Sequence, residues 1–115
     1  MIDRDNLLEC LRELADETFQ QRVWSGRVPD QMSSFPELVC QTFDDTGLSE
    51  ALSEGLVEAE LGAEVASLLE RLEAAVGRVD QSLPLEQLLV SQALREVRSL
   101  SKQIIAGLDP QAGSR

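Results

Sequence analysis

Carboxylates supply most of the chemistry that this chain could perform. Residues 28–70 contain no Lys, Arg or His, and their acidic residues nearly account for the formal net charge of −11. Those acidic residues are Asp30, Glu37, Asp44, Asp45, Glu50, Glu54, Glu58, Glu60, Glu64 and Glu70. Because concentrated carboxylates raise one another's electrostatic energy, such a stretch is either a solvated face or a surface shaped for a cationic partner.

Asp44 and Asp45, together with Glu37, are the best candidates for binding a hard divalent cation, since carboxylate oxygens are suitable ligands for such ions. Adjacent side chains on a helix point about 100° apart, however, so the two aspartates converge on one ion only with ligands from elsewhere. Divalent-cation binding at Asp44 and Asp45 is therefore an alternative function. A solvated helix C-terminus is the simpler interpretation.

The usual residues of acid–base and nucleophilic catalysis are missing. The chain has no His and no Tyr, and Lys102 is its only lysine. No glycine-rich phosphate loop follows a strand. Cys10 and Cys40 match no metal-ligand spacing and lie among helical apolar positions, which predicts two buried thiols rather than a disulfide or a redox pair. We therefore expect a protein that is not an enzyme and binds no cofactor.

Several of the carboxylates are placed where they should destabilise a helix. Asp44 and Asp45 fall in the last turn of a predicted helix, where the helix dipole disfavours anions. Glu50, Glu54 and Glu58 repeat at i, i+4 and i+8, a spacing at which like charges cost about 0.2–0.5 kcal/mol per pair. No basic residue in the stretch relieves this repulsion, so we predict that these five carboxylates bind a cationic partner.

Trp24 is one of only four aromatic residues and lies beside Arg22 and Gly26. An exposed tryptophan here would be an anchor of the kind enriched in interfaces, which makes Trp24 a candidate partner-binding residue. The favoured interpretation is that it is buried against Phe35 or Phe43 and closes one end of a helical bundle.

Basic residues concentrate in the C-terminal part of the chain. Arg95, Arg98 and Lys102 are spaced i, i+3 and i+7, which predicts one mildly basic face on a helix. Three cations against a net charge of −11 exclude nucleic acid as a partner.

Helical periodicity runs through nearly the whole chain and positions these side chains. It predicts an all-α, compact bundle of four to six helices, since no alternating run of β-branched residues suggests a strand. The expected helices cover residues 4–23, 35–46, 48–54, 65–79 and 85–89 and a last segment from Ser91 to Leu108, with a turn at 57–62. Their expected caps are Asp3 or Asp5, Ser34, Gly47, Ser49, Gly55 and Ser91.

The length of 115 residues fits one domain, which we place at residues 1–109, with a frayed tail at 110–115. The hydrophobic content of 43% is typical of a folded protein. No apolar run is long enough to span a bilayer, and residues 1–5 lack the layout of a secretory signal. We expect a cytoplasmic protein that does not bind membranes.

The chain resembles a family of small uncharacterised helical bacterial proteins in residues 22–26 (RVWSG), 33–40 (SSFPELVC), 43–48 (FDDTGL) and 95–98 (REVR). In size, acidity and helical content it is similar to bacterial immunity proteins, which neutralise toxin nucleases by presenting carboxylates to a basic active-site rim. It departs from the colicin-nuclease immunity pattern in having no matching aromatic pair or His on a recognition helix. The resemblance implies a basic partner protein, with a toxin as one candidate.

Together these features predict a non-enzymatic interaction module of the immunity or inhibitory type. The expected partner-binding residues are Trp24, Asp44, Asp45, Glu50, Glu54 and Glu58. Two alternatives stay open: a structural or oligomeric assembly subunit, for which a homodimer would suffice, and the divalent-cation protein described above.

Overall fold

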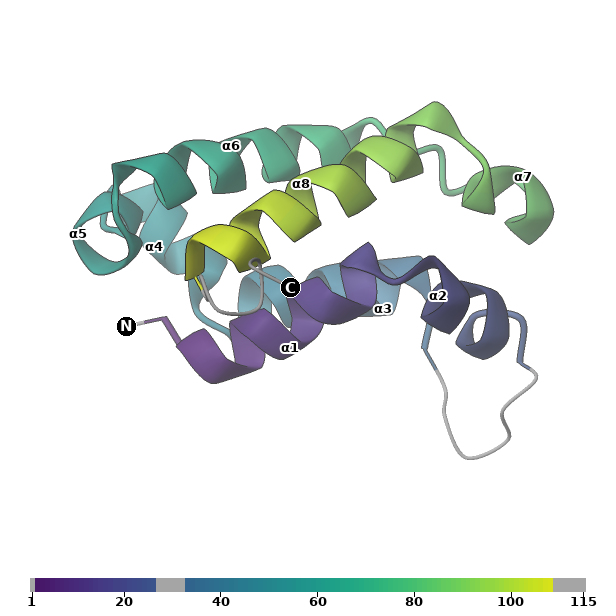
Figure 1. Cartoon of the computed structure of the whole chain (residues 1–115), viewed down its shortest axis with the longest axis horizontal. Coiled ribbons are helices and arrows are strands. Elements are labelled where there is room, and N and C mark those ends of the chain that lie inside the picture. The colour runs from purple at the N-terminus through teal and green to yellow at the C-terminus, as the bar shows by residue number, and fades with distance from the viewer. Residues whose placement is uncertain (1, 27–32, 109–115) are drawn as a thin grey trace.

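The structure, a computed structural model, describes residues 2–26 and 33–108 and builds them from helices (Figure 1). Across these two ranges there are eight α-helices, one π-helix and no strand. The elements are α1 (Arg4–Ala15), α2 (Glu17–Val23), α3 (Phe35–Cys40), η1 (Gln41–Asp45, the π-helix), α4 (Leu48–Glu54), α5 (Val57–Leu61), α6 (Ala63–Gly77), α7 (Leu85–Leu89) and α8 (Gln92–Leu108). The all-α class is confirmed, and the expected number of four to six helices is too low.

The additional helices arise where a single residue interrupts an apolar stripe. Asp16 has extended backbone angles (φ −99°, ψ 98°) and its carboxylate accepts a hydrogen bond from the Phe19 N–H at 3.0 Å. It therefore ends α1 and caps α2, where the periodicity alone predicts one continuous helix over residues 4–23. Residues 57–61, expected as a turn, form the short helix α5.

The predicted caps are mostly confirmed. Asp3, Ser34 and Ser91 each accept a hydrogen bond from the backbone N–H three residues later. Gly47 and Gly55 adopt left-handed φ angles of 80° and 71°. The expected cap at Ser49 is wrong, because α4 begins directly after Gly47 and has no side-chain cap.

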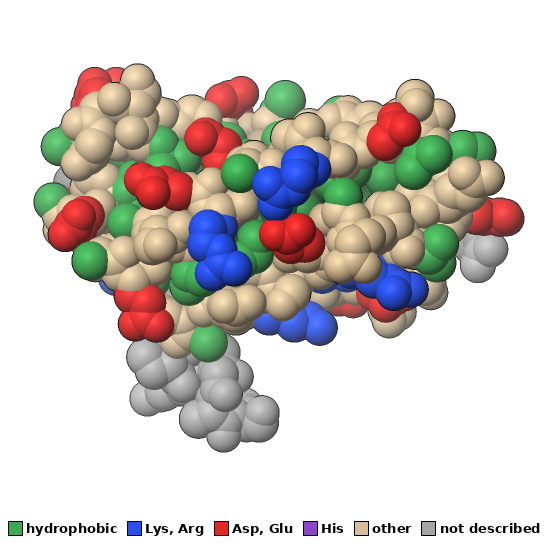
Figure 2. Space-filling model, turned by 90° about the horizontal axis from the view of Figure 1, so that it is seen from above, with side chains coloured by type: hydrophobic (Ala, Val, Ile, Leu, Met, Phe, Trp, Pro, Cys, Tyr) green, Lys and Arg blue, Asp and Glu red, His purple; other side chains and the backbone are tan. Residues whose placement is uncertain are grey.

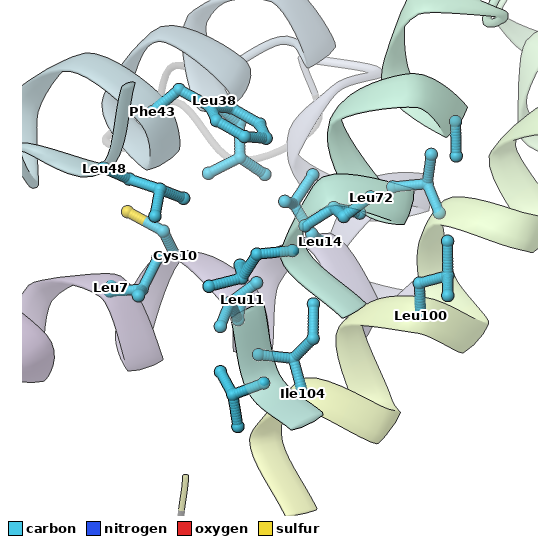
Figure 3. Close-up of a cluster of buried hydrophobic side chains, with 14 of the residues drawn as sticks. Leu7, Cys10, Leu11, Leu14, Leu38, Phe43, Leu48, Leu72, Leu100 and Ile104 are labelled. Atoms are coloured by element: carbon cyan, nitrogen blue, oxygen red, sulfur yellow. The ribbon is translucent and has the colours of Figure 1, made fainter. Parts of the chain in front are cut away.

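The core forms where α8 lies between α6 and α1 (Figure 1). On its other side α1 packs against α3 and η1, so its apolar stripe is covered from both directions. Figure 3 shows side chains from all these elements meeting in one cluster, which includes Leu7, Leu11, Leu14, Leu38, Phe43, Leu48, Leu72, Leu100 and Ile104. Packing of this kind, rather than helix propensity, supplies most of the stability of helices this short.

Short helices gather at the two opposite ends of the bundle. At one end α4 packs between η1 and α5, and α5 in turn packs on α6; we call this the α4/α5 end (Figure 1). At the opposite end α2 packs on α7, next to the start of α8; we call this the α2/α7 end. The expected tail at residues 110–115 lies outside the described residues.

Candidate functional site

The five predicted partner-binding carboxylates lie on consecutive elements of the α4/α5 end. Asp44 and Asp45 are in η1, Glu50 and Glu54 in α4, and Glu58 in α5. All five side chains are exposed, and none forms an ion pair with another residue in the described part of the chain. Figure 2, viewed onto α6 and α8, shows acidic side chains spread over this end and most Lys and Arg side chains nearer the middle and the far end. The repulsion that the sequence predicts between these carboxylates is therefore weakened by solvent alone, since no basic side chain pairs with them in the described part of the chain.

The two aspartates occur in a π-helix where the sequence predicts an α-helix end. Thr42 is fully buried and its hydroxyl donates to the Leu38 carbonyl at 2.7 Å. The Thr46 hydroxyl, also buried, donates to the Thr42 carbonyl. These inward threonines leave Asp44 and Asp45 on the outer side of a widened turn, a conformation often found at functional sites.

Leu56 stands between Glu54 and Glu58 along the chain and is 44% exposed. The sequence predicts that it points inward with Leu52, but Leu52 is only partly buried and Leu56 faces solvent. The left-handed Gly55 reverses the chain after α4, so Leu56 falls off the apolar stripe that buries Leu48 and Ala51. An exposed leucine therefore stands between two of the candidate carboxylates, Glu54 and Glu58, along the chain.

Glu60, by contrast, has a structural contact. Its carboxylate accepts a hydrogen bond from the Ile2 N–H at 3.0 Å. The Asp3 N–H donates to the Thr46 carbonyl at 2.8 Å. Both bonds fasten the residues before α1 to the α4/α5 end, so Glu60 differs in role from the five carboxylates of the candidate site.

Trp24 is not an exposed anchor. It follows α2, at the α2/α7 end, and its ring packs edge-to-face on Phe35 with the centroids 6.0 Å apart and the planes at 75°. Its indole N–H is buried and has no hydrogen-bond partner in the described ranges. The predicted packing of Trp24 against Phe35 is confirmed, although Trp24 is only partly buried, and the structure does not bring it together with the five carboxylates.

Sequence reasoning missed a buried polar pair, Gln20 and Arg98. Gln20 is fully buried and Arg98 is 6% exposed. The Arg98 Nε donates to Gln20 Oε1 at 2.8 Å, and its Nη2 donates to the Leu89 carbonyl at 2.7 Å. Gln20 Nε2 donates to the carbonyls of Glu13 (3.1 Å) and Leu14 (2.8 Å). The pair thus joins α1, α2, α7 and α8.

The predicted basic face of the last helix is wrong at Arg98, which points into the protein. A signal for this was present: Arg98 follows Val97 and stands four residues after Leu94, within the apolar stripe of α8. Burial, with a contribution from Arg95, lowers the pKa of the Arg98 guanidinium, while Glu17 acts in the opposite direction.

The two cysteines have different environments. Cys10 is buried, and that burial raises the pKa of its thiol above the ordinary value. Cys40 is exposed, so the prediction of two buried thiols is wrong for it. Phe35, Leu38 and Thr42 are the inward positions along this segment, at i, i+3 and i+7, and Cys40 falls on the opposite side.

Among the described residues, Asp44 and Asp45 have no third metal-ligating side chain beside them. In the part of the chain that the structure describes, no three His, Cys, Asp or Glu side chains are placed to hold a metal ion. Among the same residues, no helix combines the length and apolar character needed to cross a membrane.

Comparison of the chain with protein-family models, curated proteins and solved structures found no match. The resemblance to small helical bacterial proteins and to immunity proteins therefore stays a prediction.

Proposed function

We propose that the protein is a non-enzymatic interaction module that binds a basic partner protein through the α4/α5 end. The observation that supports this most is the set of five exposed carboxylates, without ion pairs among the described residues, on the successive elements η1, α4 and α5, together with the exposed Leu56 between α4 and α5. An apolar contact surrounded by charged side chains is the arrangement of many protein interfaces. Trp24 is excluded from this surface because it packs on Phe35 at the other end.

The proposed mechanism is steric and electrostatic blockade, as in an immunity-type or inhibitory protein. Exposed carboxylates accelerate the encounter with a positively charged partner, and salt screens this acceleration over about 10 Å at 0.1 M ionic strength. Leu56 supplies the apolar contact that slows dissociation once the surfaces meet. Association should therefore weaken steeply as salt is raised.

The test compares three forms of the protein as bait. The first is the wild type. The second is D44N/D45N/E50Q/E54Q/E58Q, which removes the five charges without changing side-chain size. The third is a matched control that neutralises five exposed carboxylates on other elements, E9Q/E37Q/E70Q/E73Q/E86Q. Proteins retained from a lysate of the source organism at low salt are identified by mass spectrometry, and the binding of each purified partner is then measured.

The expected result is a basic protein that the wild type and the control bind equally and the first variant binds more than tenfold more weakly. Equal binding by both variants contradicts the proposal. Recovery of only the protein itself, at low and at high salt, favours the alternative of a self-assembling structural subunit, which sedimentation would confirm as a salt-insensitive oligomer.

A further inference from the structure

A second surface lies at the other end of the molecule, where α8 passes α2. Two adjoining cavities open to solvent there, with volumes of about 410 and 420 Å³. Both are lined by Glu17, Arg98 and Lys102. They therefore form one continuous depression beside the buried arginine.

Arg98 carries a charge that the protein does not neutralise by contact. Its Nε and Nη2 donate to an amide oxygen and a backbone carbonyl, both uncharged. No carboxylate lies within ion-pair distance of Arg98 among residues 2–26 and 33–108. Glu17 acts on the guanidinium electrostatically but forms no ion pair with it, so Arg98 is a buried cation with no counter-ion in contact, an arrangement that calls for an explanation. Because Nε and Nη2 are turned to the protein, Nη1 is the donor left for a group in the cavities that Arg98 lines.

Further cations and a hydroxyl surround this position. Arg95 and Lys102, three residues before and four residues after Arg98, are exposed and line the depression, as does Ser99. Arg12 lines its far side from α1. In a chain of net charge −11, the gathering of Arg95, Arg98 and Lys102 at one depression marks it as a positively charged site.

The carboxylates at the depression, Asp16 and Glu17, each accept a hydrogen bond from another residue. Asp16 accepts the capping hydrogen bond from the Phe19 N–H at 3.0 Å. Glu17 accepts from the Gln21 amide at 3.3 Å. Helix α8 contributes three cations to the depression, Arg95, Arg98 and Lys102. They outnumber the two carboxylates, and each carboxylate already accepts a hydrogen bond.

We propose that this depression binds a small oxyanion, a phosphate or carboxylate group, with Arg98 as the inner donor and Arg95, Ser99 and Lys102 as outer contacts. Arginine and lysine are the side chains that most often bind such groups, and an arginine held rigidly by other hydrogen bonds is already oriented for the contact. An occupying anion would place a counter-charge in contact with Arg98, which Glu17 does not. This site lies at the α2/α7 end and does not depend on the function proposed for the α4/α5 end.

The test is a titration of the ¹⁵N-labelled protein with inorganic phosphate, acetate and chloride in parallel, at matched ionic strength. Because Arg98 and Gln20 together join four helices, the test variant is R95Q/K102Q, which removes two outer cations that line the depression. The matched control, R22Q/R71Q, removes two exposed cations that line neither cavity. A third variant, E17Q, removes a carboxylate that lines both cavities.

The expected result is saturable binding of phosphate or acetate, with shifts confined to amides of α2, α7, α8 and the end of α1. Affinity should fall about tenfold in R95Q/K102Q, the equivalent of one charge-assisted hydrogen bond, stay unchanged in the control and rise in E17Q. Binding of acetate as well as phosphate identifies a general oxyanion site, and binding of phosphate alone identifies a phosphate site. A response equal to that of chloride, or equal losses in both double variants, overturns the proposal.

Discussion

The buried pair of Gln20 and Arg98 makes a quantitative prediction about stability. Replacing Gln20 by methionine keeps the side-chain length and removes three hydrogen bonds: one from Arg98 Nε and those to the Glu13 and Leu14 carbonyls. A bond to a charged group contributes about 1.5–3 kcal/mol and a neutral one about 1 kcal/mol. The Glu13 carbonyl keeps a second donor, the Asp16 N–H at 3.3 Å, and so loses less. We expect Q20M to lower the free energy of unfolding by about 3–5 kcal/mol.

Urea unfolding followed by circular dichroism at neutral pH measures this loss. A domain of this length has a total stability of roughly 6–17 kcal/mol, so the change is easily detected. The matched control is Q21M. Gln21 is exposed and makes one hydrogen bond, to Glu17 on its own helix, so the change should stay within about 0.5 kcal/mol.

The double variant Q20M/R98M isolates the interaction between Gln20 and Arg98 from the other contacts of each residue. In Q20M the Arg98 guanidinium stays buried with one bond fewer, whereas replacing Arg98 as well leaves no charge to satisfy. The double variant should therefore lose about 1.5–3 kcal/mol less than the sum of the two single variants. Additive losses, or a Q20M protein within about 1 kcal/mol of the wild type, would refute the assignment of Gln20 as the support of Arg98.

Three further changes can be tested with the same unfolding assay. D16A removes the N-cap of α2 and should cost about 0.5–2 kcal/mol, and an unchanged stability would show that the break between α1 and α2 does not depend on the cap. G107A should destabilise because a Cβ there meets the Val65 Cγ2 at 2.9 Å, whereas G77A, with nothing within 4 Å, should stabilise by up to about 1 kcal/mol; the same sign for both would contradict this packing. Burial, and to a smaller extent the neighbouring Glu9, raise the pKa of the Glu13 carboxyl in the folded protein. The protonated carboxyl therefore contributes fully to the free energy of unfolding below the unfolded-state pKa, and this contribution is lost as pH rises through the folded-state pKa. E13Q should accordingly be more stable than the wild type at neutral pH and lose this advantage below about pH 4, and a pH-independent difference would exclude this cause.

The candidate site at the α4/α5 end could be identified largely from local sequence. Five carboxylates with no nearby base are visible along the chain, and charged side chains of short helices are expected at the surface. The exposure of Leu56 could not be predicted in the same way. It depends on the direction that the chain takes after Gly55, and a glycine signals such a reversal without specifying where the next residue points.

The cluster around Arg98 shows the opposite case. Its parts come from α1, α2, α7 and α8, and Gln20 stands far from Arg98 along the chain. A pattern of residues on one helix indicates which face is apolar, but it does not show that a second helix supplies an amide to an arginine on that face. The same reasoning applies to Trp24, whose burial depends on Phe35 in another helix.

The sequence by itself determined the all-α class, most helix ends and the concentration of acidic residues at 28–70, because periodicity, caps and charge act between neighbours along the chain. Tertiary structure decided that the stripe at 4–23 is divided at Asp16, that Cys40 and Leu56 are exposed, and that Arg98 is buried beside an open depression. These outcomes depend on which helices cover which faces. That choice is made by the packing of the whole core, where residues far apart in sequence compete for the same contacts.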